Sequence, residues 1–144
     1  DVPTLSLMLL IIGAAGLVGT MLAGSLVSQS LNKVLVGIPL IMTAIAFAII
    51  SVGSWVVPVA AILGLWGLVA TCAPVGWFTW LAKALPHNAE AGGGLMVAVI
   101  QLAITAGATA GGVLYDGMGY QATFIASGVF LLIATTLSVI TSRR

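Results

Sequence analysis

Residues 92–120 read GGGLMVAVIQLAITAGATAGGVLYDGMGY and contain no charged side chain before Asp116. If this stretch is helical, residues three or four apart share a face. A stripe of small residues then consists of Ala103, Gly107 and Gly111, with Gly112 beside it. A polar stripe consists of Gln101, Thr105 and Thr109. The two stripes start two positions apart, so they diverge by about 200° around the helix axis. The pattern predicts a membrane helix that packs on one face and borders a polar cavity on the other.

The composition indicates a membrane protein. Of the 144 residues, 61% are hydrophobic and only 5% are charged, and the mean hydropathy is +1.28. A soluble domain carries about 25% charged residues, so this chain has too few charges to cover a surface in water. The formal net charge of +1 argues against a basic nucleic-acid-binding surface.

The chemistry-bearing residues do not form the pattern of a catalytic site. A single cysteine, Cys72, allows no intrachain disulfide and no cysteine-based metal site. His87 is the only histidine, and no spacing resembles a phosphate loop, a metal site or a hydrolytic triad. We therefore expect a protein that is not an enzyme and that holds no cofactor and no metal.

Five apolar segments approach or exceed the roughly 20 residues that a membrane helix needs. They cover residues 5–27, 34–52, 57–81, 93–114 and 121–140. The first carries small residues at every fourth position, including Gly16, Gly19 and Gly24, and such spacing lets helix backbones approach closely. In the third, Pro74 and Gly76 are expected to break the helical regularity. The fold class predicted is all-α, a polytopic transmembrane helix bundle.

The cations predict the orientation of the bundle. With five spans, one side holds Lys33, Lys83, Arg143 and Arg144, and the other side holds Asp1 and Asp116. The positive-inside rule makes the cation side, and with it the C-terminus, cytoplasmic. The chain opens without the basic region of a signal peptide, and a piece of a longer protein explains this start most simply.

The last third of the chain resembles a known family. The run PHNAEAGGGLMVAVIQLAITAGATAGGVLYDGMGY, residues 86–120, resembles the tenth loop and eleventh helix of major facilitator superfamily transporters. The matching positions are Pro86, Ala89, Glu90, Gly107, Gly111, Gly112, Asp116 and Gly119. The run PVGWFTW, residues 74–80, is similar to the tenth helix of nucleoside-efflux members of the drug:proton antiporter group.

This resemblance implies that the five segments correspond to helices eight to twelve of a twelve-helix fold. It implies a secondary active transporter in a bacterial inner membrane that exports nucleosides, sugars or drugs by proton antiport with alternating access. The implied partners are the lipid bilayer, a small-molecule substrate and the missing N-terminal half of the same transporter, with no nucleic acid.

Two features depart from that pattern. In GSLVSQSLNK, residues 24–33, Ser28 and Gln29 stand where the family's loop motif has Asp and Arg, so this loop is not expected to carry a gate-latching charge network. None of the five segments has an Asp, Glu, His, Lys or Arg away from its ends. A proton-coupled parent would therefore hold its protonation site outside this sequence.

The candidate site residues have two interpretations each. Gln101, Thr105 and Thr109 either line the solute path or bond to neighbouring helices and to their own carbonyls. Trp66 and Trp77, which fall on nearly one helix face, either stack on an aromatic or sugar-like substrate or fill bulk and interfacial positions. For the whole protein, a non-transporting membrane scaffold and a channel stay open as alternatives. The polar stripes are sparse for a continuous aqueous lining, which ranks the channel last.

Overall fold

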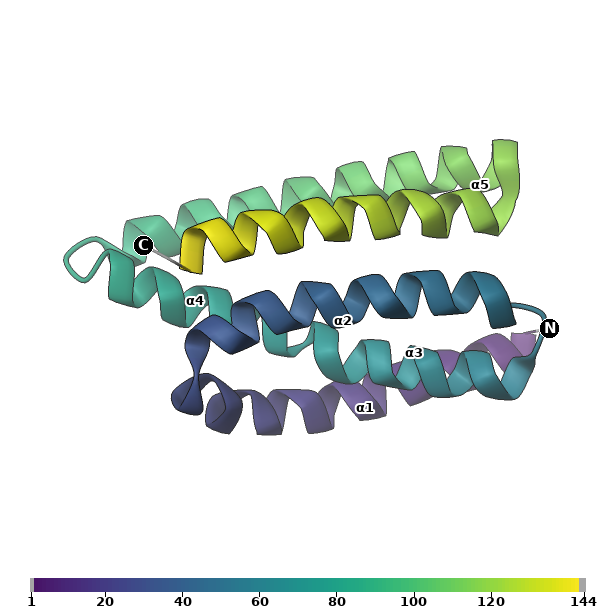
Figure 1. Cartoon of the computed structure of the whole chain (residues 1–144), viewed down its shortest axis with the longest axis horizontal. Helices are drawn as coiled ribbons and strands as arrows, with labels where there is room; N and C mark the ends of the chain where they lie inside the picture. Colours follow the sequence, from purple (N-terminus) through teal and green to yellow (C-terminus); the bar gives the residue numbers. More distant parts are fainter. Residues whose placement is uncertain (1, 143–144) are drawn as a thin grey trace.

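The computed structural model describes residues 2–142, and its secondary structure is helical. The helices in chain order are α1 (Val2–Gln29), α2 (Leu31–Val52), α3 (Val56–Ala70), α4 (Cys72–Ala84) and α5 (Ala89–Ser142), arranged as a bundle of roughly aligned helices (Figure 1). The described range contains no strand. Its helical stretches 2–29, 31–52, 56–84 and 89–142 are long and apolar enough to cross a membrane. The predicted all-α membrane bundle is confirmed.

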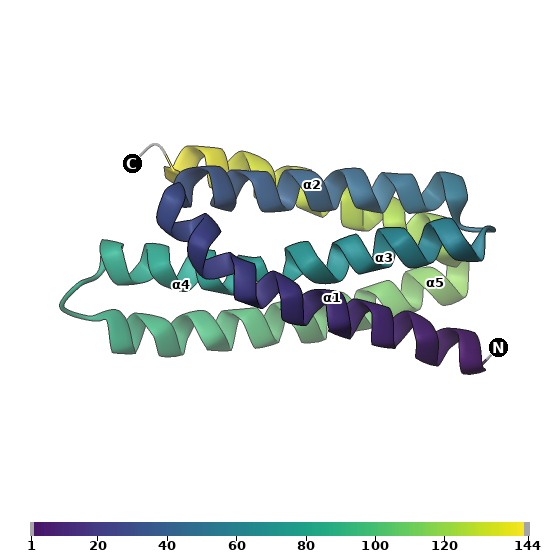
Figure 2. The same cartoon turned by 90° about the horizontal axis from the view of Figure 1, so that it is seen from below.

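The α5 helix is a hairpin whose turn lies at Gly119. This residue has φ 80° and ψ 178°, a backbone conformation that is open essentially to glycine alone. The chain reverses there, so residues 89–118, here called the first arm, run antiparallel to residues 120–142, the second arm (Figures 1 and 2). The Thr123 hydroxyl lies 3.3 Å from the Gly119 carbonyl oxygen and 3.5 Å from the Gly111 carbonyl oxygen, so the arms are in contact near the turn. The segments predicted at 93–114 and 121–140 lie in these two arms.

The third predicted segment is interrupted at Thr71, where α3 ends and α4 begins. Pro74 has no N–H to donate to the carbonyl of Ala70, and its ring crowds that carbonyl. The irregularity expected at Pro74 and Gly76 therefore falls three residues earlier, because a proline disturbs the turn that precedes it. The Thr71 hydroxyl lies 3.0 Å from the carbonyl oxygen of Gly16 on α1, so the interruption is used to bond a neighbouring helix.

Glycines set the contact between α1 and the α3–α4 pair. A Cβ added at Gly19 would overlap the Leu68 carbonyl oxygen, and one added at Gly67 would overlap the Ile12 carbonyl oxygen. At Gly16 an added Cβ would lie 3.0 Å from the Thr71 Cγ2 atom. Backbone against backbone at this distance gives the van der Waals packing that holds membrane helices together. Next to this crossing lies a small core of Ala23, Ile38, Val69 and Cys72.

Two contacts show which loops share an end of the bundle. The Asn32 side-chain amide donates to the Ser142 carbonyl oxygen at 3.0 Å, so the α1–α2 link and the end of the second arm lie together. At the opposite end, the turn at Gly53 lies against the Tyr120 ring. Lys33 follows directly after Asn32, whereas Asp1, Arg143 and Arg144 lie outside the described residues.

Candidate functional site

The first arm of α5 is the least covered helix of the bundle. Every residue from 101 to 110 is exposed, and a Cβ added at Gly107 or Gly112 would meet no atom within 4 Å. Its beginning packs against the end of α4 and the residue after it, where Gly92 lies beside Leu81 and Leu85. The arm also touches its own hairpin partner at Gly111, where an added Cβ would lie 3.8 Å from Thr123.

The polar stripe lies on this uncovered arm. The Thr105 hydroxyl donates to the Gln101 carbonyl oxygen at 2.9 Å, and the Thr109 hydroxyl donates to the Thr105 carbonyl oxygen at 2.9 Å. Each hydroxyl thereby donates its hydrogen to a carbonyl oxygen of its own helix, and its oxygen lone pairs stay available as acceptors. The Gln101 side chain makes no hydrogen bond with any residue in the range 2–142.

Gln101 is therefore the strongest hydrogen-bonding group on this face. Its amide offers two donors and one acceptor carbonyl. An amide left in hydrocarbon without partners costs several kcal/mol, so the face requires water, a polar solute or another protein surface against it. The arrangement can bind a neutral polar molecule by hydrogen bonds.

The tryptophans named as candidates lie on different helices. Trp66 is in α3 and Trp77 is in α4, on opposite sides of the interruption at Thr71. The Trp77 ring packs edge-on against the Trp80 ring, with centroids 5.9 Å apart and planes at 77°. Among residues 2–142 no ring contact joins Trp66 to Trp77. Both side chains are half-buried, and their part in solute binding stays a prediction.

The small residues named as packing positions fall into two groups. Gly16 and Gly19 are buried against α3 and Thr71. Ala103 and Gly107 are exposed on the first arm, and Gly24 faces open space on α1. Gly111 of the stripe contacts another helical segment, at Thr123 of the second arm. The packing role of Ala103, Gly107 and Gly112 stays a prediction, because Ala103 is exposed and added Cβ atoms at the two glycines would meet nothing within 4 Å.

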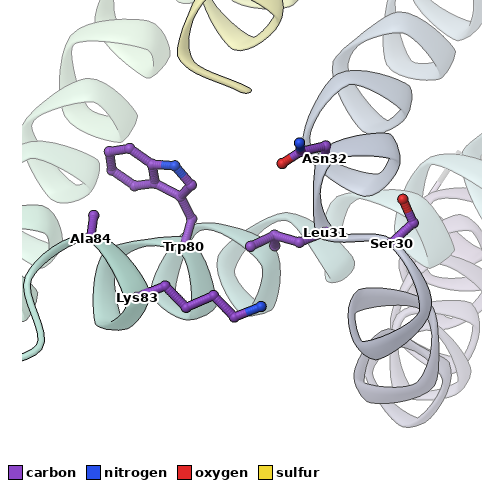
Figure 3. A pocket seen from close by; sticks show the side chains of 6 residues that line it. All are labelled: Ser30, Leu31, Asn32, Trp80, Lys83 and Ala84. Atoms are coloured by element: carbon purple, nitrogen blue, oxygen red, sulfur yellow. The ribbon is translucent and has the colours of Figure 1, made fainter. Parts of the chain in front are cut away.

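A cavity that the sequence alone did not indicate opens at the end of the bundle that holds the α1–α2 link. Its volume is about 670 Å³, and its lining residues are Ser30, Leu31, Asn32, Trp80, Lys83 and Ala84 (Figure 3). They come from the α1–α2 link, the start of α2 and the last turns of α4, so no local motif marks them. Between residues 2 and 142, no three His, Cys, Asp or Glu side chains gather as metal ligands would.

Comparison with known proteins finds relatives among curated protein sequences. No family model matches the chain, and no solved structure matches it. It is 52% identical over 138 residues to the transcription regulatory protein OpdE of Pseudomonas aeruginosa, covering 96% of this chain. It is 40% identical over 133 residues to the purine ribonucleoside efflux pump NepI of Salmonella typhimurium and 37% identical to NepI of Escherichia coli, covering 92% of this chain in each case. The chain spans 34% of the length of each of these curated relatives.

Proposed function

We propose that this chain is the C-terminal part of a secondary active transporter of the major facilitator type, which exports small polar organic solutes, purine nucleosides foremost. The similarity to two purine ribonucleoside efflux pumps over 92% of the chain supports this proposal. The observation that carries it is the polar stripe of Gln101, Thr105 and Thr109 on a helix arm that the rest of the bundle leaves exposed.

The proposed solute path lies between the first arm and the N-terminal half of the same transporter. In transporters built from two repeats, the solute site lies near the bilayer midplane at the interface between them. A second half placed against the first arm would cover its apolar residues and leave the polar stripe facing the path. The stripe would then be one wall of a cavity that opens alternately to the two sides of the membrane.

Gln101 is the proposed solute-binding residue of this wall. A side-chain amide pairs in a bidentate manner with the exposed edge of a purine base, since it offers a donor and an acceptor side by side. The oxygens of Thr105 and Thr109 accept hydrogen bonds from ribose hydroxyls or from water. Trp66 and Trp77 would contribute by stacking on the base, if the solute reaches α3 and α4.

Coupling to protons is proposed through groups outside this sequence. The apolar segments carry no Asp, Glu, His, Lys or Arg away from their ends, and a proton carrier needs such a group at membrane depth. Lys33 and Lys83 lie toward the end of the bundle that holds the cavity. By the positive-inside rule we assign that end to the cytoplasm of a bacterial inner membrane.

A regulatory role is the second candidate, because the most similar of the three relatives carries the name of a transcription regulatory protein. Four Lys and Arg residues in 144, within a chain that is 61% hydrophobic, do not supply the basic surface that binding to DNA phosphates requires. A regulatory effect through this chain would therefore act from the membrane. The small-residue contacts at Gly19 and Gly67 also fit a scaffold, whose helices associate without moving a solute.

The proposal is tested by nucleoside transport in everted membrane vesicles that contain the full-length protein. We expect saturable, inward movement of radiolabelled inosine, driven by an acidic vesicle interior and abolished by a protonophore. Vesicles without the protein are the control. Inosine movement equal to that control would contradict the transporter and favour the scaffold. Inosine movement that the protonophore does not reduce would contradict proton coupling but not transport itself.

A further inference from the structure

The cavity beside the α1–α2 link has a polar lining that solute transport along the first arm does not use. Ser30 lies in the link, Leu31 and Asn32 begin α2, and Trp80 and Lys83 lie in the last two turns of α4. Figure 3 shows Lys83 extended along α4 with its ammonium group toward the link, while Asn32 projects from α2 toward the side of Trp80. The cavity is open, so a ligand can enter it without displacing a helix.

The lining presents donors and one uncompensated positive charge. Within residues 2–142, Lys83 forms no ion pair, and the Trp80 indole N–H and the Ser30 hydroxyl have no hydrogen-bond partner. The side-chain amide nitrogen of Asn32 already donates a hydrogen bond to the Ser142 carbonyl oxygen at 3.0 Å. Among the residues that the structure describes, none with a carboxylate lines the cavity. Figure 3 draws the Trp80 ring and the Lys83 side chain on different sides of α4, so Lys83 is the charged donor of the cavity. An ammonium group selects an oxyanion, since charge-assisted hydrogen bonds to such oxygens are the strong ones.

The position of the cavity indicates that the oxyanion is part of a lipid headgroup. It lies where the α1–α2 link and the end of α4 leave the apolar helices, which is the level of the lipid headgroups in a membrane-spanning bundle. Tryptophan and lysine at helix ends are the side chains that meet headgroups, the ring beside the upper acyl chain and the ammonium group at the phosphate.

We propose that this cavity binds an anionic phospholipid, with Lys83 as the charged partner of its phosphate group and with the Trp80 ring beside the glycerol and upper acyl region. Lys33 is not part of this site, although it lies one residue beyond Asn32, because it does not line the cavity. The proposal therefore separates two lysines of equal charge at one end of the molecule, which a general attraction to a negative surface would not separate.

The test is native mass spectrometry of the full chain in detergent, with phosphatidylglycerol and phosphatidylcholine offered as competing lipids. We expect the unaltered chain to retain phosphatidylglycerol preferentially. Lys83→Gln should weaken that retention about five-fold, the effect of one lysine near a membrane surface. Lys33→Gln, the matched control, should change it less than two-fold, and Lys83→Arg should restore it. Trp80→Phe removes the indole N–H together with the pyrrole ring, and it should weaken retention a few-fold to about tenfold.

Three results would overturn the proposal. Equal losses in Lys83→Gln and Lys33→Gln would indicate a general charge effect rather than a site. Equal retention of phosphatidylcholine and phosphatidylglycerol would remove the requirement for an anionic headgroup. Displacement of phosphatidylglycerol by low millimolar inorganic phosphate would assign the cavity to a soluble anion. Circular dichroism of each variant should show unchanged helical content, as expected for exposed Lys83 at a helix end.

Discussion

Replacing Gly19 by alanine should destabilise the bundle at the crossing of α1 with α3. The added Cβ would lie 2.5 Å from the Thr71 hydroxyl oxygen and 2.8 Å from the Leu68 carbonyl carbon, and it would overlap the Leu68 carbonyl oxygen. Backbone atoms cannot rotate away, so α1 must withdraw by roughly 1 Å and lose part of its dispersion contacts. Overpacking of this kind costs about 1–3 kcal/mol. The withdrawal also weakens the contact of the Cys72 thiol with the Gly19 carbonyl oxygen, now 3.3 Å.

Gly24→Ala is the matched control, because an added Cβ at Gly24 on the same helix meets nothing within 4 Å. Both substitutions gain the same helix propensity, about 1 kcal/mol in favour of alanine. Their difference therefore isolates the packing term. At about 2–4 °C per kcal/mol for a chain of this size, Gly19→Ala should melt about 2–12 °C below Gly24→Ala.

Cys72 supplies the assay for this comparison. It is the single cysteine of the sequence and is buried at the same crossing. A thiol-reactive dye that fluoresces on coupling will therefore report its exposure during a thermal ramp in mild detergent. Melting of Gly19→Ala within 1 °C of Gly24→Ala would refute the close approach of α1 and α3, because the overlap would then have been relieved without loss.

Three further predictions concern the turns and the completeness of the bundle. With Cys72 replaced by serine, Ser54→Cys should react with an impermeant thiol reagent from outside the cell and Ser28→Cys should not, and the reverse pattern would invert the orientation. Gly119→Ala should lower stability by about 1–3 kcal/mol in a thermal melt, because its backbone conformation is open essentially to glycine alone. Gly117→Ala, whose added Cβ has open space, is its control, and equal melting would contradict the hairpin geometry. The chain alone in proteoliposomes should show no saturable nucleoside uptake, since it lacks the proposed second half, and competitively inhibited uptake would contradict that requirement.

The helical bundle and its main turn could be predicted from sequence because both depend on local chemistry. Long apolar segments permit only helices to span a membrane, and the glycines around Gly119 mark the place where the chain can reverse. Pro74 likewise indicated an interruption, although the break itself lies at Thr71. These features follow from residues that act on their own backbone.

Contacts between segments could not be predicted in the same way. Spacing suggested a shared face for Trp66 and Trp77, but the helix is interrupted at Thr71, so the two side chains lie on separate helices, α3 and α4. The cavity brings together side chains of the α1–α2 link, α2 and α4, and helical periodicity does not encode which neighbour a face will meet. The polar stripe could be identified from the sequence because it depends on spacing within one helix. Its role in solute binding depends on what faces that helix and stays a prediction.

The measurement that tests the central proposal most directly is nucleoside efflux per transporter molecule in Gln101→Ala. Loss of one hydrogen bond to a neutral solute costs roughly 0.5–1.5 kcal/mol, a few-fold to about tenfold in apparent affinity. Gln121→Ala, which removes the same amide from an exposed position outside the polar stripe, is the control. At matched membrane abundance, we expect Gln101→Ala to raise the inosine concentration for half-maximal efflux by that factor and Gln121→Ala to leave it unchanged. Identical efflux in the two variants, or a loss of Gln101→Ala abundance with efflux per molecule intact, would contradict the assignment of this face to the solute path.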